Sequence, residues 1–333
     1  MAQLGTPDAP TAQALRPYLG QFLSDLRVID YHPLLWQPIL RGIILNTRPK
    51  KSAQLYQRIW LKDGSPLLVY SQEQAVGLQA RLGDAYHVIV GMRYGNPSIA
   101  HAMRTFADEG IDRIVVLPMF PQYSSTTTSS VYDAVYEAAA GRTNPFRHQR
   151  KRFTPTLRFV APYYDHIGYI HAMRNHLQAE IAAMQAPPDK VVISFHGIPK
   201  RYVETGDPYR DHCERTAHLL AEAMGWQPDD WVLTFQSQFG PEKWLEPATD
   251  AVLESLHAQG VERPMIFSPG FVTDCLETLD ELGNEGREQF AEGGGKAEHF
   301  HFAPCLNAHP DFLAALTDLV RENAAGWAYE CHH

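Results

Sequence analysis

Two groups of side chains in this 333-residue sequence have the types and spacing that chemistry requires. The first is His196, which directly follows the apolar run 191–195 and precedes Gly197 and Pro199. The second is a series of carboxylates spaced three or four residues apart: Asp274, Glu277, Glu281, Glu285 and Glu288. An α-helix carries residues at this spacing on one face. An imidazole beside carboxylates suits a divalent first-row metal in transit, or the removal of protons.

Each group also has an ordinary structural interpretation. A single histidine after a strand is more often a hydrogen-bonded structural residue than a catalyst, and a run of acids is usually a solvated helix face. The position of the acidic series favours a chemical function, because the series begins just after a predicted strand at 265–268. Ligands of open α/β sheets bind beyond the carboxyl ends of the strands. A tight metal trap would need more defined ligands than this series offers.

The alternating strand and helix patterns of the sequence predict where both groups lie in the fold. Short β-branched or aromatic runs predict strands at Val88–Met92, Ile114–Pro118, Leu157–Val160, Val191–Phe195, Trp231–Phe235, Met265–Ser268 and His299–Ala303. Helical patterns separate them, at 97–109, 131–140, 165–184, 210–224 and 247–259. This βαβ order predicts an α/β fold with parallel sheets covered by helices. A further strand, full-length or shortened, is expected at the very start of the chain.

The two halves of the chain are similar to each other. Gly64-Ser65-Pro66 is echoed by Gly206-Asp207-Pro208, and the run 109–116 is echoed by 259–266. Two copies predict two Rossmann-like lobes, each with a four-stranded parallel sheet and flanking helices. We place the lobes at residues 1–165 and 166–333, and expect the final helix to pack back on the first lobe.

The N-terminal segment, about residues 12–45, departs from the strand–helix alternation. Its apolar residues recur at helical spacing, first in 15–23 and again in 34–44. Core packing explains most such residues. The alternative is an apolar lip over a ligand site, suited to a large flat hydrophobic ligand or to contact with a membrane surface.

Composition narrows the functional classes. Lys and Arg total 29 against 38 Asp and Glu, a formal net charge of −9, which disfavours nucleic acid as a partner. No apolar run approaches the roughly 20 residues of a membrane span, and no export signal is visible, so we expect a soluble, cytoplasmic protein. The four cysteines (Cys213, Cys275, Cys305 and Cys331) are far apart, which fits a reducing compartment.

Ten segments, in this order, resemble the ferrochelatase family nearly end to end. They are LGTPDAP (4–10), RPKKSAQLYQRIW (48–60), GSPLL (64–68), MRYGNPSI (92–99), VVLPMFPQYSSTTTSSV (115–131), YYDH (163–166), ISFHGIP (193–199), GDPY (206–209), QSQFGPEKWLEP (236–247) and DCLETLDELGNE (274–285). The resemblance implies a chelatase fold of two lobes with a porphyrin cleft between them.

The resemblance also implies roles for individual residues. His196 and Glu277 match the family's active-site pair and iron ligands, and Glu281 with Glu285 continues an acidic path for metal or protons. The implied porphyrin-binding residues are Arg93, Tyr123, Ser124, Ser125 and Trp244.

The implied activity is that of a lyase, a ferrochelatase that inserts Fe²⁺ into protoporphyrin IX to make protohaem in the last step of haem biosynthesis. Asp8, where the coproporphyrin-using branch often has tyrosine, favours protoporphyrin. No cofactor beyond the substrate Fe²⁺ is expected, and the extra C-terminal cysteines of members with a [2Fe–2S] cluster are missing. A monomer and a homodimer, with peripheral membrane contact, both fit. Two alternatives stay open: a cobalt or nickel chelatase acting on another tetrapyrrole, and a non-catalytic bilobal binding protein.

Overall fold

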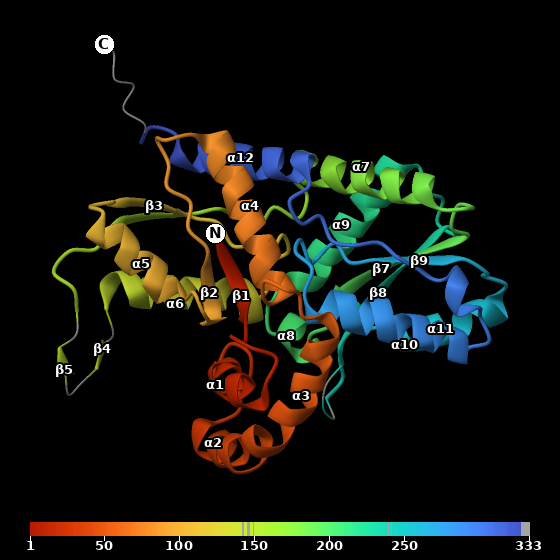
Figure 1. The fold of residues 1–333 in the computed structure, drawn as a ribbon, viewed down its shortest axis with the longest axis horizontal. Helices are drawn as coiled ribbons and strands as arrows, with labels where there is room; N and C mark the ends of the chain where they lie inside the picture. The colour runs from red at the N-terminus through yellow and green to blue at the C-terminus, as the bar shows by residue number, and fades with distance from the viewer. Residues whose placement is uncertain (142, 145–146, 149, 239, 241, 328–333) are drawn as a thin grey trace. The chain divides into compact units, whose positions relative to one another are not determined.

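The structure is a computed structural model that describes residues 1–141, 143–144, 147–148, 150–238, 240 and 242–327. Two compact units make up the chain (Figure 1). Unit 1 comprises Met1–Phe120, Ser124–Ala161 and the chain from Leu316 on, and unit 2 comprises Pro121–Tyr123 and Pro162–Ala315. Both units are built from parallel strands and flanking helices, so the predicted α/β class is confirmed.

Unit 1 contains two parallel pairs of strands. β1 (Ala2–Thr6) pairs with β2 (Gly91–Gly95), and β3 (Arg113–Val116) pairs with β6 (Thr156–Phe159). The pairs meet just beyond β3. There the amide of Ala2 donates to the carbonyl of Leu117 at 2.8 Å, and the carbonyl of Ala2 accepts from the amide of Met119 at 2.9 Å. Pro118 lies at this bridge and has no N–H to extend the ladder. The predicted four-stranded sheet is therefore two pairs joined at a single bridge.

One strand prediction for unit 1 was wrong. The sequence had left the length of the first strand open, and all five residues of β1 lie alongside β2. The strand predicted at Val88–Met92 begins instead at Gly91. Its first residues do not join the ladder, since the side chain of Gln79 accepts from the amide of Val88 at 2.8 Å. A side chain thus takes the place of a neighbouring strand.

Helices cover the strands of unit 1. α5 (Ile99–Asp108) and α6 (Ser130–Ala140) pack in a cluster that includes Ile114. α4 (Pro66–Leu82) contributes Ala75 to a second cluster around Met92. Unit 1 also contains η2 (Ser125–Ser129), β4 (Thr143–Asn144), β5 (Arg147–His148) and the part of α12 (Pro310–Ala324) from Leu316 on.

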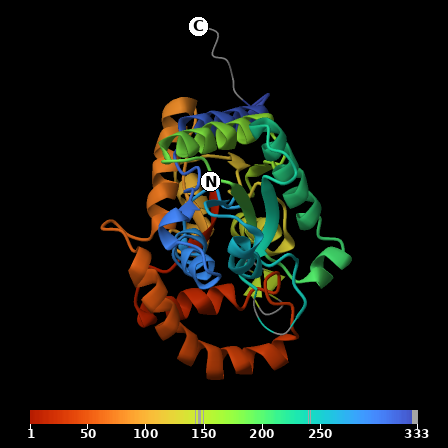
Figure 2. The same cartoon turned by 90° about the vertical axis from the view of Figure 1, so that its right-hand side faces the viewer.

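The N-terminal insertion leaves the carboxyl end of β1 and forms an arc of helices, red to orange in Figure 2. We call residues 12–45 the lip. Its helices are α1 (Ala12–Phe22), α2 (Pro33–Ile39) and the π-helix η1 (Leu40–Ile44), and α3 (Leu45–Ile59) follows. Both interpretations of its apolar residues hold in part. Leu15 and Leu40 are core residues, whereas Leu34, Leu35 and Ile43 are 80%, 71% and 61% exposed.

Unit 2 contains the four-stranded parallel sheet that the sequence predicted. The strands run in the order β10 (His301–Phe302), β9 (Pro264–Phe267), β7 (Lys190–His196) and β8 (Trp231–Gln236). Residues 191–195 of the central strand β7 are all buried. Such continuous burial requires cover on both faces of the sheet.

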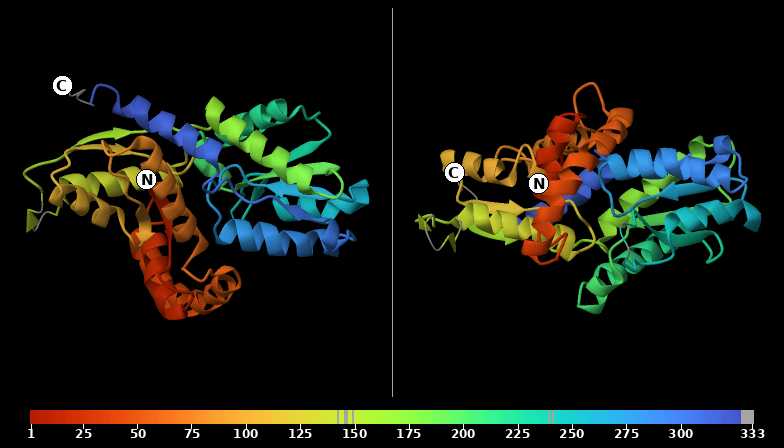
Figure 3. Two further views of the ribbon diagram at one scale, coloured as in Figure 1. Left: turned by 45° about the horizontal axis from the view of Figure 1, so that its top comes forward. Right: turned by 90° about the horizontal axis from the view of Figure 1, so that it is seen from below.

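Helices provide that cover. α7 (Ile167–Ala183) and α9 (Tyr209–Met224) lie on one side of the sheet, and α10 (Thr249–Leu256) and α11 (Gly286–Glu292) lie on the other (Figure 3). The other helical segments of this unit are α8 (Lys200–Glu204), η3 (His257–Gln259), the π-helix η4 (Glu277–Glu285), η5 (Ala297–His299) and the start of α12. Within the described ranges, no helix has both the length and the apolar character needed to cross a membrane.

Gly5 permits the close approach of β1 and β2. Its φ is +121°, and a Cβ atom there would lie 1.8 Å from the carbonyl oxygen of Tyr94. We expect Gly5→Ala to lower the free energy of unfolding by about 3 kcal/mol, because it combines backbone strain with overlap against a main-chain atom. Thermal unfolding followed by circular dichroism measures the loss. Gly42→Ala is the control, since a Cβ there meets nothing within 4 Å; equal melting temperatures for the two variants would contradict the prediction.

Candidate active site

His196 is the last residue of β7 and lies opposite Gln236 of β8. The pairing with β8 continues one bond beyond it, because the amide of Gly197 donates to the carbonyl of Gln236 at 2.8 Å. A Cβ at position 197 would lie 2.9 Å from that carbonyl oxygen. The glycine therefore lets the two backbones approach closely just beyond His196, at the carboxyl edge of the sheet.

The tautomer of His196 follows from its local hydrogen bond. Its Nδ1 lies 2.6 Å from the carbonyl oxygen of Gly197. A carbonyl only accepts, so Nδ1 carries the proton of the neutral ring and Nε2 is the acceptor. The ring centre lies 6.3 Å from that of Phe271, which follows β9. The imidazole is thus held by neighbouring strand ends with its basic nitrogen at Nε2.

Glu277 begins the π-helix η4, and one side chain links this helix to the histidine strand. The amide Nε2 of Gln236 donates to the carbonyl of Glu277 at 3.1 Å. The Oε1 of Gln236 accepts from the hydroxyl of Ser194 at 2.9 Å. Gln236 is also the register partner of His196, so the end of the histidine strand and the backbone at the start of η4 meet at the same edge of one sheet.

The acidic series is only partly the helical face that its spacing predicted. Glu277, Glu281 and Glu285 all lie on η4 and are half-buried. The i→i+5 bonds of a π-helix keep residues four and five apart on one side, so these three share a face. Glu288 is exposed on α11. The prediction of one five-residue α-helical face was wrong at both ends.

Asp274 has a structural role instead. It precedes the helix and is 2% exposed. Its Oδ1 accepts from the hydroxyl of Thr278 at 2.9 Å and from the amide of Cys305 at 3.2 Å, while its Oδ2 accepts from Asn307 at 2.7 Å. These bonds satisfy the buried carboxylate and fix the start of the acidic helix.

Glu281 is the member of the series with the most perturbed acidity. Burial and the neighbouring charge of Glu277 raise its pKa from 4.5 to about 7, against a hydrogen bond from the hydroxyl of Ser237 that lowers it. Glu285 adds further repulsion in the same direction. A carboxyl group with a pKa near neutrality both accepts and releases protons under physiological conditions.

Trp244 lies against Gly197, the residue that follows His196. A Cβ at Gly197 would lie 3.1 Å from Cε3 of the indole. Two ion pairs hold the tryptophan segment to α8. They join Nζ of Lys200 to Oε2 of Glu246 at 2.5 Å, and Nε of Arg201 to Oε2 of Glu242 at 2.7 Å. The structure therefore places Trp244 beside the residue that follows His196, and a porphyrin contact for Trp244 stays a prediction.

The polar loop predicted to bind porphyrin divides between the units. Tyr123 belongs to unit 2, where its amide donates to Nδ1 of His212 at 3.1 Å. Ser124 and Ser125 belong to unit 1. Ser124 is 1% exposed, and its hydroxyl accepts from the amide of Thr126 at 3.2 Å as the cap of η2. A porphyrin contact for these residues stays a prediction.

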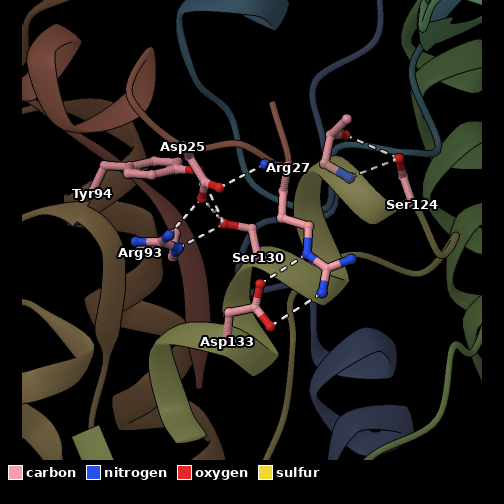
Figure 4. A network of polar contacts seen from close by, with 8 residues as sticks. Asp25, Arg27, Arg93, Tyr94, Ser124, Ser130 and Asp133 are labelled. Carbon is pink, nitrogen blue, oxygen red and sulfur yellow. Dashed lines mark hydrogen bonds and ion pairs between the residues drawn. The ribbon is translucent and has the colours of Figure 1, made fainter. Parts of the chain in front are cut away.

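Arg93 also belongs to unit 1, at β2, and its guanidinium is engaged there (Figure 4). Its Nη2 contacts Oδ2 of Asp25 at 2.5 Å, and its Nε donates to the hydroxyl of Ser130 at 2.6 Å. The sequence reasoning had singled out neither partner. It had also missed Gln236 and Ser237, although both lie in the quoted segment 236–247.

Metal-binding groups are limited in the part of the chain that the structure describes. There, no group of three or more His, Cys, Asp and Glu side chains is arranged to hold a metal ion. Cys213, Cys275 and Cys305 are free thiols in the protein interior, and burial raises the pKa of each. Cys331 lies outside the described residues.

Comparisons with known proteins identify the family of the chain. A family model described as ferrochelatase matches residues 1–324. The ferrochelatase of Alcanivorax borkumensis is 47% identical, covering 98% of this chain and 94% of that protein, and the ferrochelatase of Neisseria meningitidis serogroup A is 45% identical over the same shares. The chain belongs to the ferrochelatase family. The predicted resemblance is thereby confirmed.

Solved structures agree on the fold. SirB from Bacillus subtilis matches with a TM-score of 0.53 at 17% identity, covering 79% of this chain and 92% of that one. CbiX, described as the terminal enzyme of sirohaem biosynthesis in denitrifying bacteria, matches with a TM-score of 0.51 at 15% identity, over 78% and 94%. At these identities the likeness establishes the chelatase fold of this ferrochelatase-family chain.

The raised pKa of Glu281 predicts a pH-dependent stability. Well below pH 4.5 its carboxyl is protonated in the folded and unfolded states alike, and folding carries no penalty. Between pH 4.5 and 7 the unfolded state ionises while the folded state keeps the proton, so the penalty grows, and above pH 7 it is complete. We expect Glu281→Gln to stabilise the protein by about 3 kcal/mol at pH 8.5, and the gain to vanish near pH 4.

Melting temperatures of wild type and variant across this pH range measure the effect. Glu288→Gln is the matched control, because Glu288 is an exposed acid on the following helix. A Glu281→Gln gain that is the same at pH 5 and pH 8.5 would contradict the assigned shift.

Proposed function

We propose that this chain inserts Fe²⁺ into protoporphyrin IX to form protohaem, with His196 and Glu277 at the centre of the site. The enzyme class is that of a lyase, in keeping with the family. The observation that carries the residue assignment is the position of Gln236. It lies opposite His196 in the sheet and donates to the carbonyl of Glu277, so a proton acceptor and a series of carboxylates meet at one sheet edge.

The chemistry requires two pyrrole N–H protons to leave as the metal enters. The Nε2 of neutral His196 is the acceptor that we assign to a pyrrole proton. A site complementary to a bent macrocycle lowers the barrier further, because the distortion exposes the nitrogen lone pairs to the incoming ion.

The carboxylates of η4 serve the ion and the protons. We assign Glu277 as the transient ligand of the substrate Fe²⁺, since a hard carboxylate oxygen binds such an ion without trapping it. Glu281 and Glu285 continue on the same helix face and lead protons or metal away from the site. The pKa of Glu281, about 7, matches this relay function.

The porphyrin contacts in the proposal come from five residues. Trp244 and Tyr123 supply aromatic surface, and Arg93, Ser124 and Ser125 supply partners for the propionates. Nε and Nη2 of Arg93 already donate to Ser130 and Asp25, so Nη1 is the nitrogen that we assign to a propionate.

The test of catalysis is a pair of substitutions at the proposed site. We expect His196→Ala to abolish metal insertion while porphyrin still binds, and Glu277→Gln to reduce the rate by about 100-fold or more, since each removes a group that acts on the reacting atoms. Zinc-porphyrin fluorescence reports the rate, and Glu288→Gln is the control on the same acidic segment. Normal turnover in His196→Ala would remove that residue from the mechanism.

A metal and substrate panel separates the proposal from its alternatives. Visible absorbance follows anaerobic insertion of Fe²⁺, Co²⁺ and Ni²⁺ into protoporphyrin and coproporphyrin. We expect Fe²⁺ with protoporphyrin to be the preferred pair. A preference for Co²⁺ or Ni²⁺ would favour the other chelatases, and binding without any metallated product would favour a carrier.

We further propose a cytoplasmic protein, as monomer or homodimer, whose lip contacts the membrane surface. The support is the exposed apolar tip of the lip, where Leu34 and Leu35 are 80% and 71% exposed. We expect the double substitution Leu34→Asp with Leu35→Asp to reduce the partition coefficient for phospholipid vesicles by about 100-fold or more, because about 1.5–3 kcal/mol of apolar burial is lost per side chain. Val76→Asp, at a 71% exposed site on α4, is the control. Equal sedimentation of both variants would contradict the membrane contact.

A further inference from the structure

The carboxylate of Asp25 is a hub of four hydrogen bonds in unit 1 (Figure 4). Its Oδ2 accepts from Nη2 of Arg93 at 2.5 Å, from the hydroxyl of Tyr94 at 2.7 Å and from the hydroxyl of Ser130 at 2.5 Å. Its Oδ1 accepts from the amide of Arg27 at 2.8 Å, which closes a local turn. Charge-assisted bonds of this kind are about twice as strong as neutral ones.

The surroundings of Asp25 keep its carboxylate ionised and the hydroxyl of Tyr94 protonated. Burial of Asp25, whose side chain is 8% exposed, acts to raise its pKa, but the bonds from Ser130, Arg27 and Tyr94 and the charge of Arg93 outweigh it and lower the pKa. Burial and the charge of Asp25 raise the pKa of Tyr94, so its hydroxyl stays a donor. The carboxylate, its cation and its two hydroxyl partners therefore form one stable arrangement at neutral pH.

The hub joins three separate parts of unit 1. Asp25 lies in the lip just after α1, Arg93 and Tyr94 lie on β2, and Ser130 is the first residue of α6. The lip beyond Asp25 has limited apolar anchorage: Trp36 and Leu40 are buried, whereas the side chains at its tip face solvent. A polar anchor at its base thus adds to a small hydrophobic contact.

We propose that Asp25 is a positioning residue for the porphyrin, which holds the lip in its binding position on the strand end that carries Arg93. The inference rests on the proposed function, because it assumes that the lip contacts the porphyrin. It also assigns the main task of Arg93 to this anchor. Loss of the carboxylate leaves the reacting groups of unit 2 in place and loosens the surface that binds substrate.

The test compares Asp25→Ala and Asp25→Asn with wild type in the full-length protein. We expect Asp25→Ala to raise the KM for protoporphyrin about tenfold, with kcat changed by less than about twofold, because only binding is affected. Asp25→Asn keeps the shape but loses the charge, so its KM should be intermediate. Hydrogen exchange of amides 24–45 should quicken in both variants, while that of β7 should not.

The control removes a second link between the same two elements. Arg27 and Asp133 pair at 2.8 Å between the lip and α6, but their side chains are 45% and 50% exposed. Because exposed pairs contribute little, we expect Asp133→Ala to leave KM within about twofold of wild type.

The outcomes separate the two proposals. An unchanged or lowered KM in Asp25→Ala overturns the positioning function, the lowered value because it would mean that Arg93 had been released to bind propionate. A wild-type protein that metallates no porphyrin overturns the proposed function instead. Hydrogen exchange then still decides the anchoring, and unchanged exchange of the lip amides in both variants overturns it. Asp25→Asn keeps the experiment decisive if Asp25→Ala does not fold.

Discussion

The two hydrogen bonds of the Gln236 side-chain amide are the interactions on which the candidate site depends. A strand that ends in an imidazole and a helix that begins with a carboxylate have no direct bond between their reactive groups, yet both must face the same edge. Gln236 resolves this with a neutral side chain, accepting from Ser194 and donating to the carbonyl of Glu277. A charged residue in this place would change the balance of the acidic helix, whereas an amide orders it without adding charge.

Like charges gathered on one helix require compensation elsewhere in unit 2. The start of η4 is secured by Asp274, whose carboxylate is saturated by Thr278, Cys305 and Asn307. Further along, Glu281 is moderated by Ser237. The like charges of η4 thus destabilise this edge of the fold, and the buried hydrogen bonds of Asp274 offset that cost. The same division holds in unit 1, where a buried ionic hub supports an apolar surface.

The sequence predicted the central strands well, because β7 is continuously apolar and any register must bury it. It failed at β2, where a distant side chain, Gln79, replaces a strand partner for Val88. The π-helical form of η4 was also out of reach, since acids four residues apart share a face in either type of helix. His196 and Glu277 were singled out from their places after strands and from the family resemblance, and their functions stay predictions. Gln236 and Asp25 were not, because their importance lies in partners far away in the sequence.

The bare leucines at the tip of the lip have a consequence for handling the protein. Leu34 and Leu35 offer water an apolar surface that a second copy, a detergent micelle or a hydrophobic column matrix will also cover. Size measurements made in plain buffer therefore report adhesion between such tips as well as native assembly. The association state of this chain should therefore be measured by sedimentation over a range of detergent concentrations, since detergent covers the exposed leucines.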